Sequence, residues 1–275
     1  PIGLLLGLNG SQNPFSGTNT YKSIADLPLK QRVEAMRKEE IKKKILSEDP
    51  IKGSTFPLIN RIGYSQMYRF GSPPNYNPKP EHSIDSLAKV GGISSAELAY
   101  DILLENEGNN FIYAPLVNYA DHTFGVCQKM LEDKNAIMGL GDGGAHVGFI
   151  LDAGYPTWLI SYWSVKKKVF SMEETIRRLT SDTALAAGLQ DRGYLKVGLK
   201  ADINIIDWEN VGSSDPFMIQ DLPAGGKRLM QHTNGYVTTI VSGKITYQNG
   251  KSTTERPGLL VRSVKDKKHT LELAN

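Results

Sequence analysis

The order of three segments in the middle of the chain constrains the fold most. Phe111–Val117 is apolar and strand-like, Thr123–Glu132 has helical spacing, and Ala136–Leu140 is a second apolar run. A strand, a helix and a strand in this order predict a βαβ unit. We therefore expect an α/β fold in this part of the chain.

The second apolar run leads directly into an acidic residue, Asp142, with Gly141, Gly143 and Gly144 around it. Glycine has no Cβ, so these neighbours leave the Asp142 carboxylate accessible and permit unusual backbone angles. An accessible carboxylate at the end of a buried strand suits a metal ligand or a proton-transfer group. The alternative is a tight turn in which Asp142 only accepts hydrogen bonds from backbone amides.

Composition excludes several classes of protein. The chain has 275 residues, 40% of them hydrophobic, and a net charge of +3, which is too small to indicate nucleic-acid binding. No apolar run approaches the roughly 18 residues that span a membrane. Cys127 is the one cysteine, so we expect it to pack in a helix and expect a reducing, cytoplasmic location. The chain opens at Pro1 inside an apolar run, and we expect it to be the C-terminal part of a longer protein.

The character of the sequence changes near Gly198. Alternating residues predict a strand at 201–207, then a hairpin of Tyr236–Val241 and Lys244–Tyr247, and a short strand at Gly258–Val261. Before this point, Ser94 and Ser171 are predicted to cap helices. We predict a barrel part at residues 1–197, strands of a β-sandwich at 198–264, and a frayed tail at 265–275.

Several segments match a known pattern in order. They are Asp152–Thr157, Ser171–Ser181, Gly188–Gly193, Leu195–Asp207 with its Leu-x-x-Gly-x-x-Ala-Asp-Ile-x-Ile-Ile-Asp spacing, and Asp221–Gly226. This set resembles the amidohydrolase superfamily, specifically the C-terminal half of the N-acyl-D-amino-acid deacylase (D-aminoacylase) branch. The resemblance implies an α/β fold made of the C-terminal part of a TIM (β/α)₈ barrel and strands of a small β-sandwich domain.

The resemblance also implies a chemistry. Asp142 matches the family's acid on the last barrel strand, where it ligates metal and accepts a proton, and Zn²⁺, as one or two divalent metals, is the implied cofactor. The implied activity is metal-dependent hydrolysis of C–N amide bonds other than peptide bonds. The family's His-x-His pair does not occur among the five histidines of this sequence. We therefore expect most metal ligands outside this chain, and expect the chain alone to be inactive.

Three further residues are predicted to bind substrate. His146 follows Asp142 closely enough to face the same pocket, and otherwise packs at the barrel rim. Tyr76 fits the position where related deacylases hold the substrate carboxylate, with Ser83 as a weaker companion. Their alternative roles are a loop anchor for Tyr76 and a helix cap for Ser83.

Other functions stay open. The protein could be a cyclic-amide hydrolase of the hydantoinase or dihydropyrimidinase kind, or a non-catalytic scaffold or split subunit. The expected ligand is a small-molecule N-acyl amino acid or related amide, without nucleic acid or membrane. Exposed strand edges predict pairing with a missing N-terminal half or with a second copy of the chain.

Overall fold

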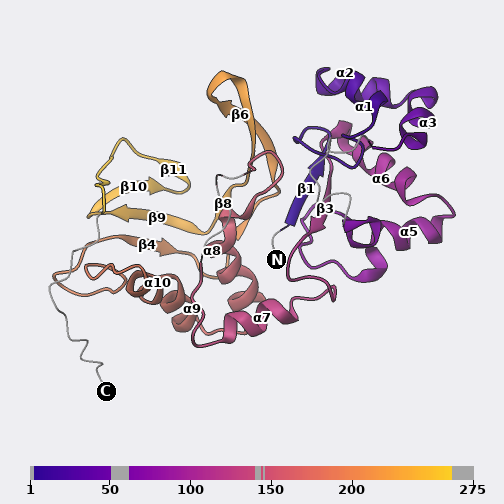
Figure 1. Cartoon of the computed structure of the whole chain (residues 1–275). Helices are drawn as coiled ribbons and strands as arrows, with labels where there is room; N and C mark the ends of the chain where they lie inside the picture. The colour runs from indigo at the N-terminus through magenta and orange to yellow at the C-terminus, as the bar shows by residue number, and fades with distance from the viewer. Residues whose placement is uncertain (1–2, 51–61, 140–143, 145, 262–275) are drawn as a thin grey trace. The chain divides into compact units, whose positions relative to one another are not determined.

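The structure is a computed structural model, and it describes residues 3–50, 62–139, 144 and 146–261 (Figure 1). The chain divides into two compact units, each assembled from separate stretches. The first unit comprises Pro1–Asp133, Leu140–Gly154 and Ser214–His232, and the second comprises Lys134–Gly139, Tyr155–Ser213 and Thr233–Asn275. The division of the chain at residues 197 and 264 stays a prediction.

The first unit combines helices with two small sheets. Its helices are α1 (Asn19–Ile24), α2 (Leu29–Met36), α3 (Glu39–Ser47), α5 (Ile84–Gly91), α6 (Ser95–Leu104) and α7 (Gly125–Glu132). Its strands are β1 (Gly3–Gly7), β2 (Tyr68–Arg69), β3 (Phe111–Pro115), β6 (Phe217–Leu222) and β7 (Gly226–Met230). Short 3₁₀ turns lie at Tyr64–Gln66, Pro80–His82, Glu105–Gly108, Asp152–Gly154 and Pro223–Gly225.

The sheet at the centre of this unit is antiparallel. Its strand order is β1–β3–β2, and Leu5 of β1 lies opposite Tyr113 of β3. Every residue of β1 and β3 is buried, and their backbone groups are paired with each other, with β2 and with neighbouring loops, including a bond from the Gly7 amide to the Gln12 carbonyl.

The prediction of a βαβ unit is wrong in its second strand. The first strand and α7 form as expected, but residues 136–139 adopt no strand, while Leu140 lies outside the described residues. Ile137 is 55% exposed, so this apolar run has no buried face to favour a strand. The structure shows a mixed α/β fold with small antiparallel sheets, and the C-terminal part of a barrel with strands of a β-sandwich stays a prediction.

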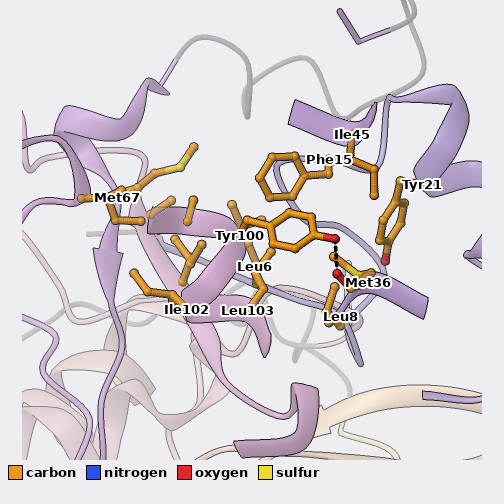
Figure 2. Packing of buried hydrophobic residues seen from close by; sticks show 14 of the residues in the cluster. Leu6, Leu8, Phe15, Tyr21, Met36, Ile45, Met67, Tyr100, Ile102 and Leu103 are labelled. Atoms are coloured by element: carbon orange, nitrogen blue, oxygen red, sulfur yellow. Dashed lines mark hydrogen bonds between the residues drawn. The ribbon is translucent and has the colours of Figure 1, made fainter. Parts of the chain in front are cut away.

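One apolar cluster joins α1, α2, α3, α5 and α6 to β1 and β3 (Figure 2). Leu6 and Leu8, at the end of β1 and just beyond it, are fully buried beside Leu103 of α6. The Tyr100 hydroxyl donates a hydrogen bond of 2.7 Å to the Met36 carbonyl, so α6 is tied to the end of α2 inside the core.

The second unit contains the remaining helices and strands. They are α8 (Tyr155–Trp158), a π-helical segment (Leu159–Lys166), α9 (Met172–Leu179), α10 (Ser181–Ala186), β4 (Ile203–Ile206), β5 (Gly212–Ser213), β8 (Thr233–Asn234), β9 (Tyr236–Val241), β10 (Lys244–Gln248) and β11 (Lys251–Ser252). One antiparallel sheet has the order β11–β10–β9–β4, and β5 pairs with β8. Among the described residues, no helix is long and apolar enough to cross a bilayer.

Local sequence signals are confirmed here. Ser242 and Gly243 turn β9 into β10 with positive φ at both positions, as a two-residue hairpin requires. The Ser94 and Ser171 side chains accept hydrogen bonds from the backbone N–H groups at the start of α6 and α9. The short strand predicted at Gly258–Val261 is wrong, because Leu259 and Leu260 are about four-fifths exposed and no strand pairs with them within the described chain.

Candidate functional site

The segment that follows Asp142 is held against the middle of β1 and the loop after it. Asp142 itself lies outside the described residues, but Gly144 and His146 have the left-handed φ values of 91° and 49°. The Phe149 carbonyl accepts a hydrogen bond from the Leu5 amide at 2.8 Å. These contacts fix the chain shortly after the predicted catalytic acid.

Two more backbone bonds hold the same segment from other directions. The Ser11 amide, in the loop after β1, donates to the Gly148 carbonyl at 3.1 Å, and the Leu229 amide of β7 donates to the Val147 carbonyl at 2.7 Å. Two distant parts of the sequence, β1 with the loop after it and β7, therefore position residues 147–149.

His146 is exposed and shapes the turn. Its carbonyl accepts hydrogen bonds from the amides of Phe149 and Ile150, both at 3.0 Å. Its imidazole stacks on the Phe149 ring with centroids 5.4 Å apart and planes at 27°. The ring is thus orientated by packing, and its contact with substrate stays a prediction.

Tyr76 lies half-buried in an aromatic cluster. Its ring packs edge-on against Phe70 and Tyr113, with centroids 5.1 and 5.8 Å apart. The Gln231 amide donates to the Tyr76 hydroxyl at 3.2 Å, and burial raises the pKa of that hydroxyl. Tyr76 and Tyr113 also line a small cavity of about 30 Å³ together with Asp152. Tyr76 is therefore a neutral hydroxyl at physiological pH, and its binding of a substrate carboxylate stays a prediction.

Ser83 is the N-cap of α5. Its hydroxyl accepts a hydrogen bond from the Ser86 amide at 3.2 Å and donates to the Ser86 hydroxyl at 2.9 Å. The side chain is 2% exposed, and these bonds account for the helix-cap role. A contact between Ser83 and substrate stays a prediction.

Two features near these residues were not foreseen from the sequence. His122 hydrogen-bonds through its Nδ1 with the hydroxyl of the buried Tyr68. The second is an open cavity of about 450 Å³ beside the loop after β1, with Gly148 in its wall. No local pattern indicates either feature, since each brings together residues distant in the sequence.

The described residues do not form a metal centre by themselves. No group of three or more His, Cys, Asp or Glu side chains within residues 3–50, 62–139, 144 and 146–261 is arranged to hold a metal ion. A single carboxylate does not hold a catalytic metal, so Asp142 would need ligands from elsewhere.

The chain resembles solved and curated proteins over part of their length. It is 35% identical over 89 residues to a dihydroorotase of Lactobacillus acidophilus. This match covers 31% of this chain and 20% of that protein. It is 37% identical over 90 residues to a 5′-deoxyadenosine deaminase of Methanobrevibacter smithii, covering 28% of this chain and 20% of that protein.

Solved structures of D-aminoacylase also match. Two of them share 21% and 20% identity with this chain at a TM-score of 0.37, covering 65% and 69% of it. The matched regions make up 34% and 36% of the chains in those two structures. The chain thus spans about a fifth of the curated relatives and about a third of the solved ones.

The match to a protein family extends much further than these pairwise likenesses. The Amidohydrolase family matches residues 1–247, which include β1, the segment around Asp142, and strands β4 and β9 of the second unit. This chain belongs to the amidohydrolase family.

Proposed function

We propose that this chain is part of a metal-dependent hydrolase that cleaves C–N amide bonds other than peptide bonds, of the N-acyl-D-amino-acid deacylase kind. The family match over residues 1–247 is the observation that carries the proposal. The ordered sequence segments from Asp152 to Gly226 support the deacylase branch.

Asp142 is the proposed proton carrier. Its carboxylate takes a proton from the attacking water, whose oxygen bonds to the amide carbonyl carbon. The C–N bond then breaks, and Asp142 returns the proton to the leaving amine nitrogen. The glycines on both sides of Asp142 leave room for both groups.

A divalent metal would polarise the amide carbonyl when bound. Since the sequence contains no His-x-His pair, we expect most of its ligands to come from outside this chain. We propose a small-molecule N-acyl amino acid as substrate, with His146 and Tyr76 as contacts.

The test uses the full-length protein that contains this chain. Asp142→Asn should lower kcat for N-acyl-D-amino acids by about 100-fold or more while circular dichroism stays unchanged. The matched control is Asp101→Asn, because Asp101 is exposed on α6 and pairs with Lys42 there. Equal turnover of Asp142→Asn and the wild type would remove Asp142 from the reaction.

Assays on the same protein distinguish two alternative functions, cyclic-amide hydrolysis and a non-catalytic scaffold. The 89-residue match to a dihydroorotase favours cyclic-amide hydrolysis, and faster cleavage of hydantoin or dihydropyrimidine rings than of acyl-D-amino acids would establish it. A non-catalytic scaffold predicts no stoichiometric metal by elemental analysis and no amide hydrolysis on any of these substrates.

A further inference from the structure

Gln231, directly after β7, contacts the hydroxyl of Tyr76. The side-chain nitrogen Nε2 of Gln231 donates to the Tyr76 hydroxyl at 3.2 Å and to the Ser214 carbonyl at 2.6 Å. All three residues belong to the first unit, and the Gln231 and Tyr76 side chains are half-buried. Because Tyr76 is the proposed substrate contact, a residue that fixes its hydroxyl also affects that contact.

The Ser214 carbonyl determines which way round the Gln231 amide lies. A carbonyl oxygen only accepts hydrogen bonds, so it selects the Gln231 nitrogen and would repel the Gln231 side-chain oxygen. Ser214 is itself fixed, because its amide donates to the His232 carbonyl at 2.9 Å and its hydroxyl accepts from the His232 amide at 3.1 Å. The nitrogen, with its two hydrogens, therefore faces both acceptors.

This orientation sets the direction of the hydrogen bond at Tyr76. A phenol has one hydrogen to donate, and an amide nitrogen does not accept. The Tyr76 oxygen therefore accepts from Gln231, and the Tyr76 hydrogen is donated to a different acceptor. The ring is held in this place by its edge-on packing against Phe70 and Tyr113.

The β6–β7 hairpin also holds the segment after Asp142. The Leu229 amide of β7 donates to the Val147 carbonyl at 2.7 Å. At the base of the hairpin, the Asp215 carboxylate accepts a hydrogen bond from the Ser72 hydroxyl, in the loop between β2 and α5. One hairpin therefore contacts both segments that carry predicted site residues.

We propose that Gln231 is a positioning residue for substrate binding and acts through Tyr76. By donating to the Tyr76 oxygen, Gln231 makes that hydroxyl a hydrogen-bond donor to the substrate carboxylate. This role rests on the proposed function, in which Tyr76 contacts an N-acyl amino acid.

The experiment measures kcat and KM of the full-length protein with N-acetyl-D-alanine and with N-acetyl-D-alaninamide, which has no carboxylate. Gln231→Met keeps the length of the side chain but removes its donor. It should raise KM for the acid about tenfold, raise KM for the neutral amide about threefold or less, and change kcat less than about twofold. The matched control is Gln220→Met, the same change on exposed β6, where the Gln220 nitrogen lies beside Gly225 at the hairpin turn.

A double variant shows whether Gln231 acts through the tyrosine. Tyr76→Phe alone should also raise KM for the acid about tenfold, and adding Gln231→Met should raise it no further. Effects that multiply in the double variant would overturn the role, as would an unchanged KM in either single variant.

A direct signal from Tyr76 separates this role from the proposed reaction. In protein labelled with [¹³Cζ]tyrosine, Tyr76→Phe identifies the Tyr76 resonance, which Gln231→Met should move and Gln220→Met should not. If the wild type hydrolyses neither compound, the proposed function fails, but N-acetyl-D-alanine should still move this resonance saturably, with about tenfold weaker binding in Gln231→Met. Equal binding in the two proteins, or an unmoved resonance in Gln231→Met, would overturn the role.

A second variant covers loss of stability. If Gln231→Met lowers the melting temperature, Gln231→Glu takes its place, because its carboxylate accepts the Tyr76 hydrogen and turns it away from the ligand. Binding of N-acetyl-D-alanine should then fall more than tenfold, and retained binding would count against the role.

Discussion

A close approach between Gly148 and Ser11 allows a direct test of how the segment after Asp142 is held. A Cβ added at Gly148 would lie 2.7 Å from the Ser11 Cβ. The same two residues are joined by the 3.1 Å bond from the Ser11 amide to the Gly148 carbonyl. Gly148→Ala therefore cannot be accommodated unless one of the two segments moves.

The cost can be worked out from these contacts. Forcing a methyl group into a packed contact costs about 1–3 kcal/mol, and losing one backbone hydrogen bond costs about 0.5–1.5 kcal/mol. We expect Gly148→Ala to lower the free energy of unfolding of the first unit by about 2–4 kcal/mol. Ser11→Gly removes the opposing Cβ and should cost less than about 1 kcal/mol by itself.

The double variant separates the clash from other effects. In Gly148→Ala combined with Ser11→Gly the added methyl has space, so we expect the pair to recover about 1–3 kcal/mol relative to the sum of the single changes. Gly91→Ala is the control, because a Cβ there has its nearest neighbour, the Ile93 Cγ1, at an ordinary 3.8 Å. It should be neutral or slightly stabilising.

The choice of assay follows from the positions of the tryptophans. Trp158, Trp163 and Trp208 all belong to the second unit, so their fluorescence does not report the first. Far-ultraviolet circular dichroism in urea and hydrogen exchange of the Ser11 amide report the relevant region. A Gly148→Ala variant as stable as the wild type, or no recovery in the double variant, would refute the reasoning.

Three further predictions test the core and the helix ends. Tyr100→Phe removes the bond to the Met36 carbonyl and should cost about 1–3 kcal/mol in urea denaturation, while Tyr247→Phe at a half-exposed position should cost less than about 0.5 kcal/mol. Burial raises the pKa of Tyr68 from 10.0 to about 12, so its protonated form stabilises the fold fully below pH 10. That contribution, at most about 3 kcal/mol, is lost as the pH rises from 10 to 12, and Tyr68→Phe should show a smaller loss of stability over this range. Equal losses in both proteins would contradict this assignment. Ser94→Ala should cost about 1 kcal/mol and speed hydrogen exchange in the first turn of α6, and unchanged exchange would contradict the cap.

The sequence predicted local structure well where the signal is itself local. The Ser94 cap depends on a hydrogen bond to a residue three positions away, and the hairpin turn depends on the backbone angles of Ser242 and Gly243. Neither needs a distant partner. Such short-range preferences can therefore be read without the tertiary structure.

The pairing of strands could not be predicted in the same way. The apolar run at residues 136–139 has the composition of a buried strand, yet Ile137 is more than half exposed. A short apolar run shows that burial is favourable, but not which neighbour provides it. The antiparallel partnership of β1 with β3 depends on residues more than a hundred positions apart.

The same distinction between local and long-range signals applies to the candidate site. The helix-cap alternative for Ser83 could be predicted from residues near it in sequence, and the structure shows that cap. The bond from Gln231 to Tyr76 could not be predicted, because the end of β7 and the loop before α5 meet only in the folded unit.

The interleaving of the two units has a consequence for synthesis on the ribosome. Leu229, in the β6–β7 hairpin, completes a buried cluster with Leu5, Phe111 and Tyr113, although most of the second unit precedes it in the chain. The first unit thus stays unfinished while helices α8 to α10 emerge. A nascent chain halted after residue 197 would expose this apolar surface and become a substrate for chaperones or proteases.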